Sequence, residues 1–340
     1  TIQVLLTINE SVLDGIESGD FLFADDRPKI RFTNTVPNSE LVLEYSTTTS
    51  EKIFAYSQIL PFFRGVASGL IGQEAKNLIN PFTFLDNMST RCFVPVQPLS
   101  MDISVFDKVV NTTQRTSRAT LSLVRVITGK TPKVENWLSY MPTTITAPKD
   151  ALVVFSFYSE DRPEEIEITG AATATYTVPL LKRDVYSCLV NLADFTLVAG
   201  NVVNIACAGH TVTVNIAPVE PEHTKIAWLN EWNCPEIFTC KGMLTITNET
   251  SQTLAKYAEE GKERSTVLEV LNPRTYSVYT GFLETKEEVA WLHTILEAKK
   301  IWIEVEGEFI EVVRDFKSLP LYETRNLLDA YLLKFEKAVV

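Results

Sequence analysis

The stretch "GFLETKEEVAWLHTILEAKKIWIEV", residues 281–305, contains the signals of a helix that leads directly into a strand. Thr285 and Glu288 have the spacing of a capping box, in which both side chains accept hydrogen bonds from free amides of the first turn. The spacing therefore predicts a helix that begins at residue 286. Apolar side chains then recur at helical spacing, which predicts one buried face. These side chains are Val289, Leu292, Ile295 and Leu296.

The residues after this helix read as a small sheet. "IWIEV" and "EFIEVV" flank Glu306-Gly307, a dipeptide that favours a hairpin turn. Near the end of the chain, Tyr331, Leu333 and Phe335 alternate with polar neighbours, as they would in a last strand. The pattern predicts one helix packed on a sheet or sandwich.

Short alternating apolar runs recur through the rest of the chain, among them "IQVLLTI", "LSLVRVI", "LVVFSFY" and "TVTVNI". Alternation of apolar and polar residues is typical of half-buried strands, so we expect a mainly β protein built from several β-sandwich domains. Proline-containing polar stretches at 143–150 and 217–223 suggest domain connections. We expect an N-terminal β-rich domain over 1–147, an immunoglobulin-like β-sandwich over 148–218, and a third domain over 224–340.

Composition limits the possible functions. The chain has 340 residues, a net charge of −12 and five cysteines. No clustered Lys and Arg residues stand out to neutralise phosphates, which argues against specific nucleic-acid binding. The apolar runs are too short for a membrane span, and the N-terminus lacks the pattern of a signal peptide. With few, scattered cysteines, we expect reduced thiols and folding inside a cell.

Residues that could support catalysis or bind metal are scattered. His210 and His223 fall in polar connections, and His293 lies beside the apolar helix face, where a packing role is favoured over a general base. His223, Cys234 and Cys240 lack zinc-site spacing and a fourth ligand. We find no nucleotide-binding, hydrolase or metalloprotease motif, so we expect no enzyme activity, cofactor or metal. A hydrolase would need carboxylates that are distant in sequence.

Two tryptophans support an alternative from another class. Trp228 and Trp232 in "WLNEWNCPEIF" are candidates for stacking on a sugar ring if they are exposed, because their faces are large and apolar. The alternative function is a carbohydrate-binding or adhesion β-sandwich protein. The simpler interpretation is that both side chains fill the seam between the second and third domains.

Three stretches of the third domain resemble tail structural proteins of phages and prophages of Bacteroidetes. They are "KIAWLNEWNCPEIFTCKGMLTI", "TYSVYTGFLETKEEVAWLHTILEAKKIWIEVEGEFIEVVRD" and "LLDAYLLKFEKAV", within residues 224–340. "SGDFLFADDRPKIRFTN" is similar to the N-terminal part of such proteins, though less specific. "NCPEIFTC" departs from the aromatic-rich turn of that pattern.

The resemblance implies a virion protein of the distal tail or baseplate with a tail-tube-like β-sandwich and a flanking helix. In that fold, copies form a ring whose strands join into an inner barrel. The partners implied are further copies, other tail proteins and DNA that passes without specific contacts, and assembly would precede lysis in the host cytoplasm. The candidate oligomer contacts are Trp302, Phe309, Ile310 and Val312.

Overall fold

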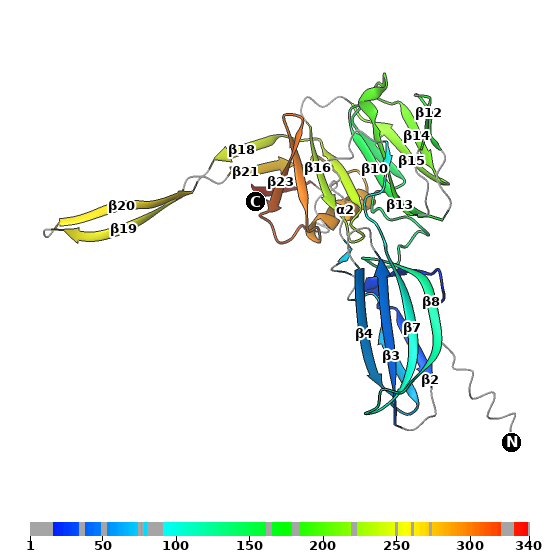
Figure 1. Cartoon of the computed structure of the whole chain (residues 1–340). Coiled ribbons are helices and arrows are strands. Elements are labelled where there is room, and N and C mark those ends of the chain that lie inside the picture. Colours follow the sequence, from blue (N-terminus) through cyan, green and yellow to red (C-terminus); the bar gives the residue numbers. More distant parts are fainter. Residues whose placement is uncertain are drawn as a thin grey trace. The chain divides into compact units, whose positions relative to one another are not determined.

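The protein is mainly β. The computed structural model describes residues 16–33, 38–48, 53–73, 76, 78–79, 91–160, 165–178, 184–218, 223–248, 251–259, 262–271, 274–320 and 330–338. In this part of the chain, strands form several separate sheets and a single α-helix accompanies them (Figure 1). The expected mainly β, multi-sheet fold is therefore confirmed. The predicted strand "IQVLLTI" lies outside the described residues.

The chain divides into two units. Unit 1 comprises Thr1–Phe82, Val94–Trp137 and Glu231–Asn233. Unit 2 comprises Thr83–Phe93, Leu138–Asn230 and Cys234–Val340. Most of the two stretches predicted as separate domains, 148–218 and 224–340, thus falls within one unit; the three-domain division stays a prediction.

Unit 1 is built on a five-stranded sheet with the order β1-β8-β7-β3-β4, and a two-stranded sheet of β2 and β5. Apolar side chains alternate along β2, where Ile30 and Phe32 are buried and their neighbours are exposed. The strands are β1 (Phe21–Phe23), β2 (Lys29–Thr33), β3 (Ser39–Thr48), β4 (Ile53–Pro61), β5 (Val66–Leu70), β7 (Leu99–Val109) and β8 (Arg115–Ile127), with a 3-10 turn, η1, at Ala24–Asp26.

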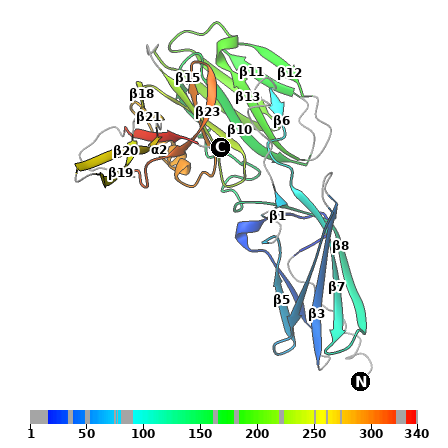
Figure 2. The ribbon, with the colours of Figure 1, turned by 60° about the vertical axis from the view of Figure 1, so that its left-hand side comes forward.

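Unit 2 contains a two-sheet sandwich, green in Figures 1 and 2 apart from the cyan β6. One sheet has the order β10-β13-β6 and the other β12-β11-β14-β15-β9. The strands are β6 (Cys92–Phe93), β9 (Thr144–Ala147), β10 (Leu152–Ser159), β11 (Glu165–Gly170), β12 (Ala174–Thr177), β13 (Asp184–Asn191), β14 (Val202–Cys207) and β15 (His210–Ile216), with η4 at Leu192–Asp194.

The rest of unit 2 is a seven-stranded sheet with the order β17-β16-β22-β23-β24-β21-β18, together with a separate pair of strands, β19 and β20. These elements are β16 (Thr224–Leu229), β17 (Pro235–Cys240), β18 (Leu244–Asn248), β19 (Ser251–Glu259), β20 (Lys262–Leu271), β21 (Arg274–Tyr279), α2 (Lys286–His293), η5 (Thr294–Leu296), β22 (Ile301–Val305), β23 (Glu308–Arg314) and β24 (Leu332–Lys337).

Strand β10 has buried side chains on both of its faces, since every residue from Val153 to Tyr158 is buried. One face packs in an apolar cluster with one half of the seven-stranded sheet. The cluster consists of Phe93, Val154, Leu189, Ala227, Leu229, Ile237 and Trp302. A strand that is buried on both faces has a continuous apolar sequence, which explains "LVVFSFY".

The opposite face of the seven-stranded sheet is covered by α2, which begins at Lys286 as predicted. Thr285 accepts a hydrogen bond from the Glu288 amide at 3.1 Å, and the Glu288 carboxylate accepts one from the Glu284 amide at 2.8 Å. The Thr285 half of the predicted capping box is confirmed, whereas the Glu288 carboxylate binds the amide of Glu284, which precedes the N-cap. The predicted hairpin is also confirmed, because Glu306 and Gly307 both have positive φ between β22 and β23.

Candidate assembly arm and polar sites

The residues between β18 and β21 form a two-stranded arm, β19 with β20, which we call the β19–β20 arm. Its register runs from Ser251 opposite Leu271 to Glu259 opposite Lys262. Among the described strands, these two pair only with each other, and Figure 1 shows them as a separate yellow ribbon. The arm therefore receives no sheet partner from the part of its own chain that the structure describes.

Apolar side chains are exposed on both faces of the arm. Leu254 and Val267 are cross-strand partners and are 48% and 46% exposed. Tyr257, 46% exposed, lies three residues from Leu254 and so points to the opposite face, because side chains alternate along a strand. Leu268, at the irregularity beside Leu254, is 66% exposed. The arm thus has no buried face of its own.

A two-stranded hairpin is marginally stable at best in water unless something packs on it. Exposed strands with apolar side chains are also templates for pairing with another chain. The sheet beside the arm adds an exposed apolar pair, because Tyr279 on β21 lies opposite Leu332 on β24 and both are exposed. These surfaces are the strongest candidate for an interaction site in the described residues.

The four residues that we expected to form oligomer contacts lie elsewhere. Trp302 is buried within the apolar cluster, and Phe309 packs against it half-buried. Val312 is buried opposite Ile301, and Ile310 is half-buried opposite Ile303. Trp302 and Val312 serve the packing of their own chain, whereas Phe309 and Ile310 keep part of their surface accessible. The contact expected at these four positions stays a prediction.

Both tryptophans of the carbohydrate alternative are buried. Trp228 donates from Nε1 to Thr294 Oγ1 at 2.9 Å and packs on Trp291 with ring centroids 6.3 Å apart. Trp232, in unit 1, donates from Nε1 to the carbonyl oxygen of Lys130 at 2.7 Å. In this structure neither indole offers an open face to a sugar.

Beneath α2, the carboxylate of Glu236 on β17 is fully buried and accepts hydrogen bonds from four residues. Ser139 Oγ lies 2.9 Å from Oε2, and the Tyr140 amide donates to Oε1 at 2.8 Å. Asn230 Nδ2 and Trp291 Nε1 donate at 2.8 Å each. One side chain thus connects the segment at 139–140, the end of β16 and the helix.

Burial raises the pKa of Glu236 to about 7, although the hydrogen bonds from Tyr140, Asn230, Ser139 and Trp291 favour the charged form. A raised carboxyl pKa is sometimes found in general acids. Here every oxygen is occupied by protein donors deep in the core, and a substrate has no access to it. Glu236 holds α2 in place through its hydrogen bond from Trp291.

The three histidines lie apart. His293, at the end of α2, has its ring edge-on to Tyr331 with centroids 5.8 Å apart, in keeping with a packing role. His210 packs on Phe157, and burial lowers the pKa of its imidazole. His223 Nε2 lies 2.5 Å from Asp150 Oδ2. Among the described residues, no group of three His, Cys, Asp or Glu side chains is placed to hold a metal ion.

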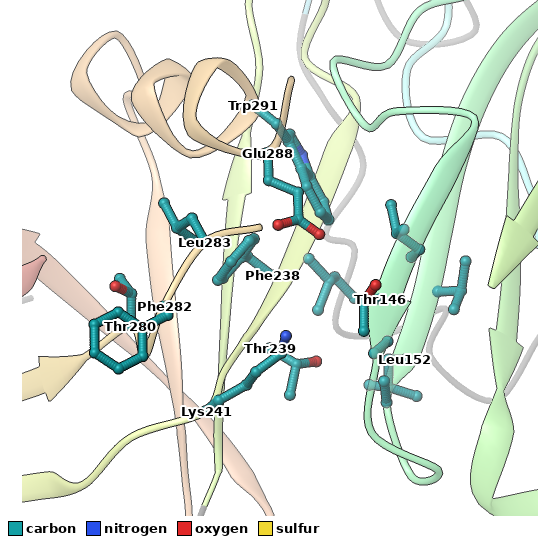
Figure 3. A pocket seen from close by; sticks show the side chains of 15 residues that line it. Thr146, Leu152, Phe238, Thr239, Lys241, Thr280, Phe282, Leu283, Glu288 and Trp291 are labelled. Atoms are coloured by element: carbon teal, nitrogen blue, oxygen red, sulfur yellow. The ribbon is translucent and has the colours of Figure 1, made fainter. Parts of the chain in front are cut away.

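A pocket lies between α2, β17 and the β9–β10 region of unit 2 (Figure 3). Lys241 at its edge pairs with Glu284 at 3.3 Å, and Thr146 Oγ1 donates to the same carboxylate at 3.0 Å. Glu288 on the helix side bonds the Glu284 amide. The described residues that line the pocket include no His, Cys or Ser.

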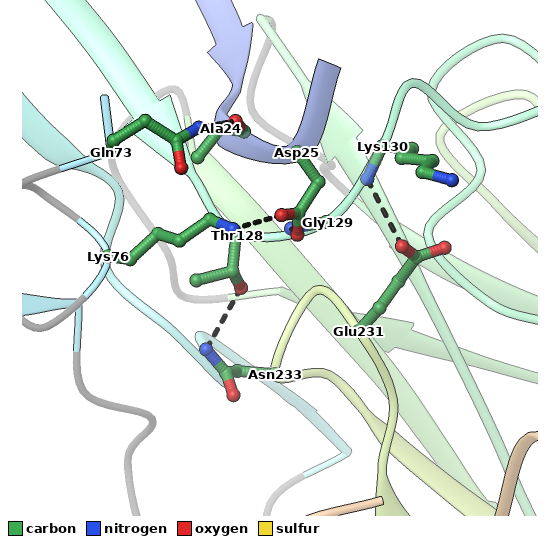
Figure 4. Close-up of polar contacts among 9 residues, drawn as sticks. All are labelled: Ala24, Asp25, Gln73, Lys76, Thr128, Gly129, Lys130, Glu231 and Asn233. Carbon is green, nitrogen blue, oxygen red and sulfur yellow. Dashed lines mark hydrogen bonds and ion pairs between the residues drawn. The ribbon is translucent and has the colours of Figure 1, made fainter. Parts of the chain in front are cut away.

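Unit 1 has its own polar cluster (Figure 4). Asp25 forms an ion pair with Lys76 and accepts a 3.0 Å hydrogen bond from the Gly129 amide. Burial opposes ionisation of Asp25, but these partners outweigh it and lower its pKa. Asn233 Nδ2 donates to Thr128 Oγ1 at 3.0 Å. These contacts fix η1 and the 231–233 turn within unit 1.

A comparison with protein-family models finds none that matches this chain, and a comparison with curated proteins finds no significant match. In the described part of the chain, no helix has the length and apolar character needed to cross a membrane.

Sequence reasoning missed two features of unit 2. The strand "SQTLAKYAE" was not expected, because Lys256 and the exposed apolar residues obscure any single buried face. The turn signal "EEGKE" at its end would have indicated a hairpin. The burial of Glu236 has no local signal, since its donors come from segments distant in sequence.

Proposed function

We propose that the chain is a non-enzymatic structural component of a bacteriophage tail, of the distal tail, baseplate or tube-associated class, which assembles with further copies into a ring around the DNA passage. The observation that carries the proposal is the β19–β20 arm. Leu254, Tyr257, Val267 and Leu268 leave apolar surface exposed on both faces of an isolated hairpin.

A second copy of the chain is the occupant that these surfaces favour. Each copy would carry both the arm and the exposed Tyr279–Leu332 pair. When a surface on one copy binds a different surface on the next, the contact repeats and forms a ring if the rotation closes. Burying the arm in this way removes the apolar area and the open strand edges together.

The resemblance of residues 224–340 to phage tail proteins supports a tail as the assembly. The net charge of −12 is consistent with it, because a negative passage does not bind the phosphates of DNA. Other tail proteins would be the further partners, and the virion would be the final location after assembly in the host cytoplasm.

Two measurements test the proposal. Negative-stain images and native mass of the purified chain are expected to show rings of one defined order. Peptides of the chain are expected in phage particles purified from a lysate of the strain that encodes it, at many copies per particle.

The two measurements test different parts of the proposal. Monomers at all concentrations would overturn the ring. Rings from a chain that is absent from purified particles would leave assembly standing and overturn the tail assignment.

A further inference from the structure

Strand β6 lies at the edge of the three-stranded sheet in the sandwich of unit 2. It consists of Cys92–Phe93 and, among the described strands, pairs only with β13. In the register of this pair, Cys92 lies directly opposite Cys188. Both cysteines are free thiols, and they are 2% and 0% exposed. The sheet therefore holds two buried thiols side by side on adjacent strands.

The hydrogen bonds between the two strands show which kind of pair the cysteines form. The Leu189 amide donates to the Arg91 carbonyl at 2.7 Å, so these two residues are a hydrogen-bonded pair. Antiparallel strands alternate between hydrogen-bonded and non-hydrogen-bonded pairs, which makes Cys188 and Cys92 a non-hydrogen-bonded pair. The Cα atoms of such a pair are typically about 4.5 Å apart, within the range of about 4.4 to 6.8 Å that a disulfide spans. The register thus gives the two cysteines the spacing of a disulfide.

Both thiols lie on the same face of the sheet, inside the sandwich. Directly opposite residues of an antiparallel pair share one face, and side chains alternate along each strand. Phe93 and Leu189, which follow the two cysteines, belong to the apolar cluster beside the seven-stranded sheet. Cys92 and Cys188 therefore occupy the opposite face, which is turned toward the other sheet of the sandwich.

The remaining three cysteines have no such arrangement. Cys207 is the last residue of β14 in the facing sheet, Cys234 precedes β17, and Cys240 is the last residue of β17. In the registers of the described strands, none of these three lies opposite another cysteine. The strand geometry therefore favours Cys92 as the partner of Cys188.

We propose that Cys92 and Cys188 are a thiol pair that a small disulfide such as oxidised glutathione converts into a cross-strand disulfide between β6 and β13. One cysteine thiolate attacks a sulfur of oxidised glutathione, forms a mixed disulfide and releases one glutathione thiolate. The thiolate of the other cysteine then attacks the cysteine sulfur of the mixed disulfide, forms the Cys92–Cys188 bond and releases the second glutathione. In total, two protein thiols and one oxidised glutathione give one protein disulfide and two reduced glutathiones.

Burial makes the exchange depend on local opening of β6, because a buried thiol does not react with an external reagent. A two-residue strand at the edge of a sheet has few hydrogen bonds to break and opens more easily than the central strands. Once formed, the disulfide would keep β6 on β13 at the point where the chain leaves unit 2, after Phe93. The inference does not depend on the proposed tail function.

The test incubates the purified full chain with oxidised glutathione in the absence of denaturant, quenches the exchange with acid, blocks free thiols and maps disulfides by mass spectrometry without reduction. The expected product is a link between the Cys92 and Cys188 peptides, with an intact mass lower than that of the reduced chain by two hydrogen atoms. The midpoint of thermal unfolding should rise by roughly 5 °C, because the link closes a loop of about 100 residues, and should return after reduction.

Two variants complete the test. Cys92→Ser is expected to lose the link, and Cys207→Ser, the matched control at another buried thiol, is expected to retain it. A wild-type chain that stays fully reduced, stops at a glutathione adduct, or links Cys188 to any other cysteine would overturn the proposal. A link that leaves the unfolding midpoint unchanged would overturn the role of the disulfide in holding β6. The wild-type map decides the pairing even if a variant fails to fold.

Discussion

The hairpin β22–β23 and the β19–β20 arm are built alike but packed differently. Both are antiparallel pairs joined by a short connection within unit 2. In the β22–β23 hairpin, both faces are covered. Trp302 is buried in the apolar cluster on one face, and Ile303 is buried on the other face, which α2 covers. In the second, Leu254 and Tyr257 are exposed on opposite faces. The comparison teaches that strand pairing alone does not bury the apolar side chains of a hairpin, because the described residues leave those of the arm exposed. A second copy is the cover that we propose for them.

The largest effect on stability is expected from Trp302→Ala, which removes the largest side chain of the apolar cluster beside the β22–β23 hairpin. We expect a loss of about 4 kcal/mol in the free energy of unfolding, because the change leaves a cavity in the cluster. Urea unfolding followed by far-UV circular dichroism measures it. Tyr257→Ala in the arm is the matched control, with an expected loss below about 0.5 kcal/mol. Equal losses of stability in the two variants would contradict the difference in packing between the β22–β23 hairpin and the arm.

The second-largest effect is the pH dependence that Glu236 gives to the free energy of unfolding. Its pKa is about 7 in the folded chain against an ordinary 4.5, so the folded state binds more protons between these values. The stabilisation is fully present below pH 4.5 and is lost as the pH rises through 7, a change of about 3 kcal/mol. Urea titrations at pH 5, 6, 7 and 8 are the measurement.

Glu236→Gln is the control for this prediction, since the amide does not titrate. The variant is expected to be less stable, because an amide cannot accept from every donor that surrounds the carboxylate. Its stability should nevertheless change less with pH than that of the wild type. An unchanged pH dependence in the variant would assign the effect to other groups.

A smaller effect is expected at the turn of the packed hairpin. Gly307 has φ +84, and a Cβ there meets no atom within 4 Å, so the cost of Gly307→Ala is backbone strain alone. We expect a loss of about 1 kcal/mol. Gly200→Ala, at φ +84 in equally open space, is the matched control and should cost the same. A much larger loss at Gly307 would show that the turn has a further role.

Sequence patterns predicted the elements that local signals define. Thr285 and Glu288 placed the start of α2, and Glu306-Gly307 placed the hairpin turn, because caps and turns depend on neighbouring residues. The burial of Trp302 and Val312 by other parts of their own chain could not be predicted. Alternation shows that one face of a strand is buried, but not whether the covering layer comes from the same chain or from another copy.

The most direct test of the central claim is sedimentation equilibrium of three purified chains over a range of concentrations. The wild type is expected to associate into one defined oligomer. The double variant Leu254→Ser with Val267→Ser should remain folded and stay monomeric, because it removes the cross-strand apolar pair of the arm. Val198→Ser, at an exposed apolar side chain outside the arm, should associate like the wild type. If the double variant associates as strongly as the wild type, the arm is not the assembly element.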